Sequence, residues 1–74
     1  MSSTAIRPRT FNGKRMKTVR QAASISRDDL AQRTGIPADG IAKYERNART
    51  PRADTLGLIS AALGCPVDDL FGAE

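Results

Sequence analysis

Residues 26–51, SRDDLAQRTGIPADGIAKYERNARTP, contain two short helical patterns that are separated by only three residues. Gly35, Ile36 and Pro37 form this break. Two helices joined so tightly cannot lie antiparallel along their lengths, so we expect them to cross at a steep angle. The second helix then stands out from the surface as a ridge, with Lys and Arg crowding its far end.

Local signals predict where these two helices begin and end. Ser26 is an expected N-cap, and it precedes two aspartates in the first turn, where the helix dipole favours negative charge. Gly35 is expected to end the first helix in the left-handed conformation. Pro37 opens the next helix, residues 37–46, at a first-turn position where its missing N–H does no harm. Asn47 can take the left-handed exit that glycine usually takes.

Helical patterns on both sides of this stretch predict three more helices. One begins at Asn12 and fades at Ser24, another lies between Pro51 and Gly64, and a short one begins at Pro66. The apolar residues predicted to face the core are Met16, Val19, Ala23, Leu30, Ala31, Thr34, Ile41, Tyr44, Leu56, Ile59 and Leu63. We therefore expect an all-α fold: one compact five-helix domain over residues 12–74, preceded by a flexible basic arm over residues 1–11.

The composition excludes several classes of function. The 74 residues include one cysteine, Cys65, and no histidine, so disulfides, Cys/His metal sites and Cys–His nucleophile pairs are excluded. We interpret Cys65 as a small, partly buried apolar residue in preference to a redox group or ligand, and we expect no metal and no cofactor. A single cysteine fits a reducing cytoplasm. No apolar run approaches the roughly 18 residues that span a membrane, and the N-terminus lacks the apolar core of a secretory signal.

The charges divide along the chain. Residues 1–52 hold all twelve Lys and Arg with four acidic residues, a net +8, whereas residues 53–74 hold four acidic residues and no base, a net −4. One basic face and one acidic end are expected. A polyanion is the natural partner of the basic face, because neutralised phosphates release counterions; a solvated surface with a chance bias is the alternative.

Two opposite charges lie at the edges of core-facing stripes. Arg20 follows Met16 by four residues on the first helix, and Glu45 follows Ile41 by four on the third. Buried apart, these charges would be costly, whereas together they would be tolerated. The pattern alone leaves two possibilities open, an ion pair that ties the two helices together or two side chains that point to solvent.

Several spaced features together resemble the helix-turn-helix domain of the phage repressor and Cro family, also called the xenobiotic-response-element type. The matching segments are VRQAASIS with its Arg20, SRDDLAQRTGI, GIAKYERNARTP and TLGLISAALGCPVDDLF, and they cover about residues 13–71. In this family a buried arginine–glutamate pair links helices one and three. The resemblance therefore implies that Arg20 and Glu45 form such a pair.

The resemblance also implies which residues would contact double-stranded DNA. In the family the second helix crosses the DNA backbone and the third lies in the major groove. The positions that would face the bases are Ala38, Asp39, Gly40 and Lys43, and those that would meet the backbone are Arg27, Arg46, Arg49 and Arg52. Family members often carry Gln, Ser, Arg or Thr at the first of these positions. Ala38 offers only contact with a thymine methyl, Asp39 can accept from cytosine, and Lys43 alone is a strong donor to guanine. Direct contacts with bases are therefore few, and part of the specificity is expected from the arm, from DNA shape or from Arg27.

The resulting hypothesis is a bacterial or phage-encoded transcriptional regulator that binds a specific DNA sequence as a homodimer. Cro-like repressors, restriction–modification controller proteins and DNA-binding antitoxins of this family have this size, so a toxin or another regulator is a possible protein partner. Val67, Leu70 and Phe71 are the expected dimer surface, although the same residues could simply close the monomer core. An enzyme is not expected, because Asp68 and Asp69 are adjacent and point in different directions, and no serine has a histidine to activate it. The alternative is a protein-interaction module of the same fold that docks a basic partner through its acidic C-terminal half.

Overall fold

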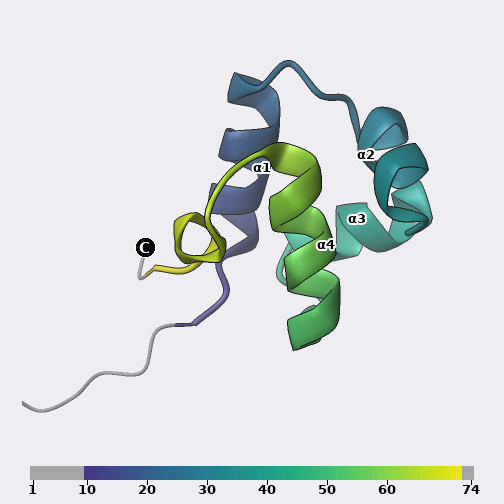
Figure 1. Ribbon diagram of the computed structural model, residues 1–74. Coiled ribbons are helices and arrows are strands. Elements are labelled where there is room, and N and C mark those ends of the chain that lie inside the picture. The colour runs from purple at the N-terminus through teal and green to yellow at the C-terminus, as the bar shows by residue number, and fades with distance from the viewer. Residues whose placement is uncertain (1–9, 73–74) are drawn as a thin grey trace, which may run out of the picture.

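The computed structural model describes residues 10–72, which form a single bundle of four α-helices and one 3-10 helix (Figure 1). The helices are α1 (Gly13–Ala22), α2 (Arg27–Thr34), α3 (Ala38–Glu45), α4 (Ala53–Leu63) and η1 (Val67–Leu70). The prediction of five α-helices is therefore corrected to four. The fifth segment has only four residues, between Pro66 and the extended residue Phe71, and four residues are too few to propagate the i→i+4 hydrogen bonds of an α-helix.

The predicted caps of α2 are confirmed. The Ser26 hydroxyl accepts from the Asp29 amide, while the Asp29 carboxylate accepts from the Ser26 amide, which completes a capping box. Gly35, with φ of 77°, ends the helix in the left-handed conformation. The prediction for Pro37 is corrected by one position. Its ψ of 145° is extended, so it is the N-cap of α3 and the helix runs from Ala38 to Glu45 instead of over 37–46.

Two other predicted helix ends are also confirmed, those after α3 and α4. Asn47 takes the left-handed exit after α3 with φ of 59°, and Gly64 does the same after α4 with φ of 71°. Asn47 has a second role, because its side-chain oxygen accepts from the Gly13 amide at 2.8 Å. The C-terminal end of α3 is thereby joined to the first amide of α1, 34 residues earlier in the chain.

The core is apolar and draws on every helix. Its buried members are Met16, Ile25, Leu30, Ile41, Tyr44, Leu56, Ile59, Leu63 and Leu70. The predicted stripes of α3 and α4 are thus confirmed, and Val19, Ala31 and Thr34 are half-buried. Ala23 does not belong to the core as predicted. Helix α1 ends at Ala22, so Ala23 lies in the exposed turn, and Ile25 supplies the buried side chain instead.

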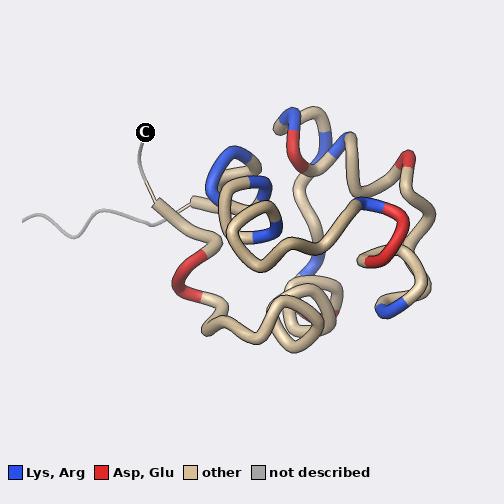
Figure 2. The backbone as a smooth tube through the Cα atoms, turned by 90° about the horizontal axis from the view of Figure 1, so that it is seen from above, with Lys and Arg blue, Asp and Glu red and all other residues tan. Residues whose placement is uncertain are grey.

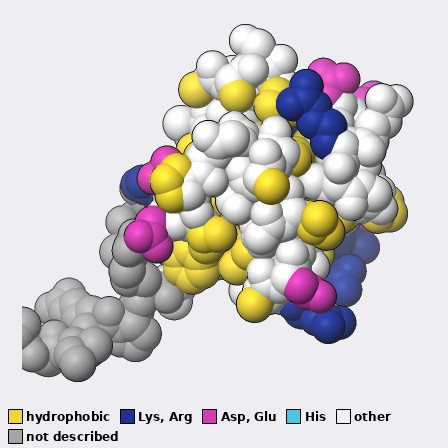
Figure 3. Space-filling view, in the orientation of Figure 1, with side chains coloured by type: hydrophobic (Ala, Val, Ile, Leu, Met, Phe, Trp, Pro, Cys, Tyr) yellow, Lys and Arg dark blue, Asp and Glu magenta, His cyan; other side chains and the backbone are white. Residues whose placement is uncertain are grey.

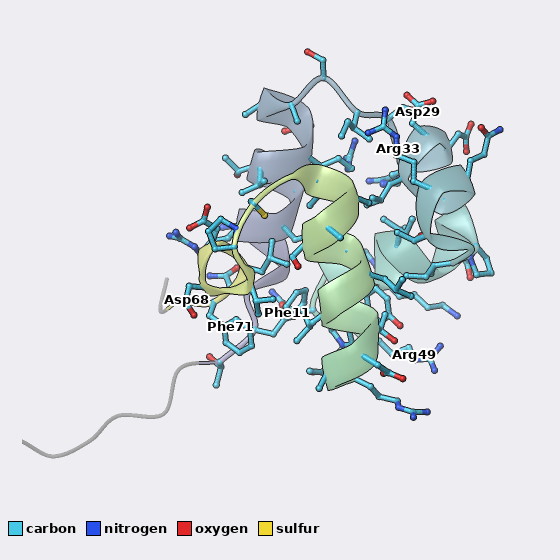
Figure 4. The ribbon with its side chains drawn as sticks, viewed as in Figure 1. Phe11, Asp29, Arg33, Arg49, Asp68 and Phe71 are labelled. Atoms are coloured by element: carbon cyan, nitrogen blue, oxygen red, sulfur yellow. The ribbon has the colours of Figure 1, made fainter. Side chains whose placement is uncertain are left out.

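The two ends of the described chain pair with each other. Phe11 and Phe71 form an isolated antiparallel bridge, in which the Asn12 amide donates to the Leu70 carbonyl at 2.9 Å and the Gly72 amide to the Thr10 carbonyl at 3.0 Å. Figure 4 shows the two phenylalanines side by side at the base of the bundle, beside η1. The bridge holds residues 10 and 11, the last two of the arm predicted over 1–11, while residues 1–9 lie outside the described part of the chain.

Helix α1 approaches the end of α3 so closely that only glycine fits at its first position. A Cβ on Gly13 would collide with the Tyr44 carbonyl oxygen and would lie 2.8 Å from that of Glu45. This contact fixes the C-terminal end of α3 against α1. Among the helices of residues 10–72, none combines the length and the apolar character needed to cross a membrane.

Candidate nucleic-acid interface

The short break between α2 and α3 sets the position of the candidate interface. Leu30 of α2 and Ile41 of α3 are both fully buried in the same apolar core, and the two helices pack against each other. Three residues, 35–37, separate them, and Figure 1 shows α2 and α3 lying across one another at the same side of the bundle. With Ile41, Tyr44 and Glu45 turned inward, the opposite side of α3 faces out.

Arg20 and Glu45 form a buried ion pair, which settles the two possibilities left open by the sequence. The Arg20 Nε lies 2.6 Å from Glu45 Oε2, and the two side chains are 8% and 2% exposed. A second bond joins Arg20 Nη2 to Glu45 Oε1 at 3.3 Å, and Nη1 donates to the Ile25 carbonyl at 2.8 Å. Every polar atom of this buried cluster has a partner, so the pair fixes α3 on α1.

Arg27 belongs to the same cluster, which the sequence had not indicated. Its Nε lies 3.1 Å from Glu45 Oε1, and its side chain is 45% exposed. One side of this guanidinium is thus bound to the buried carboxylate, while the other side remains open to solvent. The residue expected to contact the DNA backbone is therefore oriented by the buried pair. The two arginines flank one carboxylate, and a periodicity pattern cannot show such an arrangement.

The exposed surface of α3 carries few polar groups. Asp39 and Lys43 form an ion pair with 3.3 Å between Oδ2 and Nζ, and their side chains are 78% and 43% exposed. Ala38 is half-buried. A Cβ on Gly40 would lie 3.3 Å from Ile36 Cγ2, so this position faces the preceding turn instead of pointing outward. Of the four positions expected to face bases, Asp39 and Lys43 are those with polar side chains available.

Basic residues follow α3 in the connection to α4. Arg46, Arg49 and Arg52 are all exposed. Figure 4 shows Arg49 reaching away from the bundle, and Figure 3 shows Lys and Arg side chains gathered along the lower right edge of the molecule. Arg52 lies 3.8 Å from Asp54, a pair that is open to solvent at both ends. Such exposed pairs contribute little to stability, so these charges are available to an external anion.

A shallow hollow brings α1 into the candidate interface. Its lining includes Lys17 and Gln21 of α1, Arg27 of α2, and Asp39 and Ala42 of α3. Sequence reasoning missed Lys17, Gln21 and Ala42. All three lie outside the buried stripes of their helices, but only the packing of α1 against α3 shows that they lie next to each other.

The acidic C-terminal segment packs beside basic residues of α1. In Figure 2 the segment lies at the side of the bundle from which the chain leaves, and the Arg15 Nε donates to the Asp69 carbonyl at 3.1 Å. Of the expected dimer residues, Leu70 is completely buried in the monomer core, Val67 is 37% exposed and Phe71 is half-buried. Leu70 has no surface left for a partner, so the expected dimer surface is reduced to Val67 and Phe71.

Comparison with known proteins agrees with this geometry. Residues 16–70 match the helix-turn-helix family HTH_3. The chain belongs to this family. Its fold is that of the Cro/C1 repressor type, which confirms the resemblance drawn from the sequence.

Three known proteins illustrate what this chain is similar to. Over 62 residues the chain is 34% identical to the HTH-type transcriptional regulator ImmR of Bacillus subtilis, and the match covers 84% of this chain and 49% of that protein. The chain thus spans about half the length of this relative. The restriction–modification controller protein C.AhdI of Aeromonas hydrophila is similar with a TM-score of 0.76 at 25% identity, over 80% of this chain and 89% of that one. The P22 c2 repressor, solved in complex with a synthetic operator, gives a TM-score of 0.73 at 29% identity, over 78% and 88%.

Proposed function

We propose that this helix-turn-helix domain binds a specific sequence of double-stranded DNA as a transcriptional regulator, with α3 in the major groove. The main support for this proposal is the position of the exposed cations around α3. Arg27 stands at the start of α2, Lys43 on the outer side of α3, and Arg46, Arg49 and Arg52 follow in the connection to α4.

This arrangement suits a helix that enters the groove between two phosphate backbones. A major groove about 12 Å wide admits one α-helix, and cations before and after that helix can then meet phosphates on both sides. Phosphate contacts position the protein, whereas base contacts from the helix itself specify the sequence. The buried pair of Arg20 and Glu45, together with the bond between Asn47 and Gly13, holds α3 rigidly on α1.

The similarity to regulators supports the same assignment. The P22 c2 repressor was solved with an operator, and ImmR is a transcriptional regulator. We extend the proposal to a homodimer that pairs through Val67 and Phe71, the residues of the expected surface that keep exposed area. Two copies of α3 would then lie ~34 Å apart, one turn of DNA.

Selection of bound sequences from a random duplex pool tests the proposal. Enrichment of a palindromic site is expected, because a symmetric dimer presents two copies of α3. The control is Arg33→Ala, which removes an exposed cation on the far end of α2, where the guanidinium donates to the Ala62 carbonyl. The control should recover the same site. If the parent protein binds no duplex even at low salt, the DNA-binding proposal fails, and docking of a protein partner on the acidic C-terminal segment becomes the better hypothesis.

A further inference from the structure

The exposed face of α3 offers a very small set of groups for contact with bases. Ile41, Tyr44 and Glu45 are buried, and Gly40 faces Ile36. The remaining positions are two alanines, 38 and 42, and the ion pair of Asp39 with Lys43. Hydrogen bonds from α3 to base edges must therefore come from one carboxylate and one ammonium.

These two groups are not independent. Asp39 Oδ2 and Lys43 Nζ lie 3.3 Å apart, so an acceptor and a donor stand side by side on this face. In the major groove, cytosine presents the N4 amino donor, and guanine presents the O6 and N7 acceptors. Within one C·G base pair, cytosine N4 and guanine O6 are themselves hydrogen-bonded partners. The closely spaced ion pair thus has the complementary pattern to the edge of a single C·G pair.

An A·T pair fits the same two groups less well. On an A·T pair the carboxylate can accept from adenine N6, and the ammonium can donate to adenine N7 or to thymine O4. In either position the lysine meets one acceptor instead of the two adjacent acceptors of guanine. The lysine end of the ion pair therefore favours C·G over A·T.

We propose that Asp39 and Lys43 act as one unit that recognises a single C·G base pair in each half-site, with Asp39 on cytosine N4 and Lys43 on guanine O6 and N7. This inference rests on the proposed DNA binding and adds the identity of the base pair. Asp39 also lowers the affinity for every DNA sequence, because its carboxylate repels the phosphates. Asp39 is thus a specificity-determining residue that weakens non-specific binding.

The test is a duplex selection with the parent protein and with the variants Asp39→Ala and Lys43→Ala, with Arg33→Ala as the matched control. Both α3 side chains are exposed, so unchanged circular dichroism spectra are expected. The parent should prefer C·G about tenfold at one position of the half-site, and each α3 variant should lose the preference at that same position. Asp39→Ala should in addition bind scrambled duplex severalfold more tightly than the parent, and Lys43→Ala more weakly. The control should keep the preference.

A further variant, Asp39→Asn, tests which base the side chain at position 39 contacts. An asparagine side chain can pair with adenine N6 and N7, so this variant should accept A·T at the same position. The inference is overturned if Asp39→Ala and Lys43→Ala alter two different positions, or if neither alters any. A parent protein that binds a defined site without a C·G preference overturns this inference alone, whereas a parent that binds no DNA overturns the proposed function as well.

Discussion

Replacement of Arg20 by alanine should destabilise the domain more than any exposed change. Arg20 makes three hydrogen bonds, two to the Glu45 carboxylate and one to the Ile25 carbonyl. The Glu45 side chain is 2% exposed, so the variant leaves a buried carboxylate without its main partner. Removal of one partner from a buried pair costs ~3–5 kcal/mol. Because Arg27 remains on Glu45 Oε1 at 3.1 Å, we expect the lower end, about 3 kcal/mol.

This loss is large for a small domain. A chain of 74 residues has a free energy of unfolding of roughly 4–11 kcal/mol, so about 3 kcal/mol removes a quarter or more of it. The melting temperature should fall by about 12–24 °C. Urea unfolding followed by far-ultraviolet circular dichroism measures the free energy directly, and an unchanged slope of free energy with denaturant would show that compactness is preserved.

A double variant separates the buried charge from the lost packing. Arg20→Met combined with Glu45→Leu removes both charges and keeps the volume, so it should be more stable than Arg20→Ala. The reasoning is refuted if Arg20→Ala costs less than ~1 kcal/mol, the range of exposed pairs, or if the double variant is less stable than the single one.

Four further predictions concern other parts of the molecule. Gly13→Ala should destabilise the protein by about 1–3 kcal/mol, because the added Cβ would strike the end of α3. Gly57→Ala, where nothing lies within 4 Å of the added Cβ, should stabilise α4 by up to ~1 kcal/mol. Equal melting temperatures for the two variants would contradict both predictions. Arg27→Ala should weaken binding to cognate and scrambled duplexes alike and lower the salt slope by about one unit in titrations at several salt concentrations, and a loss confined to the cognate site would reassign this residue to a base. Burial, with a smaller effect of Asp69, raises the pKa of the Cys65 thiol. The folded state therefore favours the neutral thiol, and the stability that the neutral thiol contributes is lost as the pH rises through the pKa of the folded protein. Alkylation of Cys65 in mildly alkaline buffer should be slower than that of free cysteine and should accelerate in urea. Val67→Asp should weaken the dimer in sedimentation, and an unchanged protein that sediments as a monomer both free and on DNA would rule the dimer out.

Much of the local structure was predictable from short-range signals. The N-cap at Ser26, the left-handed exits at Gly35, Asn47 and Gly64, and the apolar stripe of α4 each depend on a few neighbouring residues. The errors were also local. Pro37 stands one position before the helix it was expected to begin, and the last segment is a 3-10 turn.

The candidate interface was predictable only in outline. The basic residues on and around α3 follow from the sequence, and Arg20 with Glu45 follows from the family resemblance. The contact of Arg27 with the same carboxylate was not predictable. It joins residues 18 apart in the sequence, across the turn between α2 and α3, and a helical periodicity does not describe the angle of that turn. The same limit explains Lys17, which is an ordinary exposed residue of α1 until α3 packs beside it.

The sequence by itself determined the caps of α2, the left-handed exits after α3 and α4, the apolar stripes of these two helices and how the charge divides between the two halves. These properties depend on the chemistry of neighbouring residues. Only the tertiary structure decided that Gly13 must be a glycine, that Leu70 is buried in the monomer core, and that Phe11 pairs with Phe71. Each of these depends on backbone and side chains brought together from distant parts of the chain, where steric exclusion and burial, not local propensity, set what a residue does.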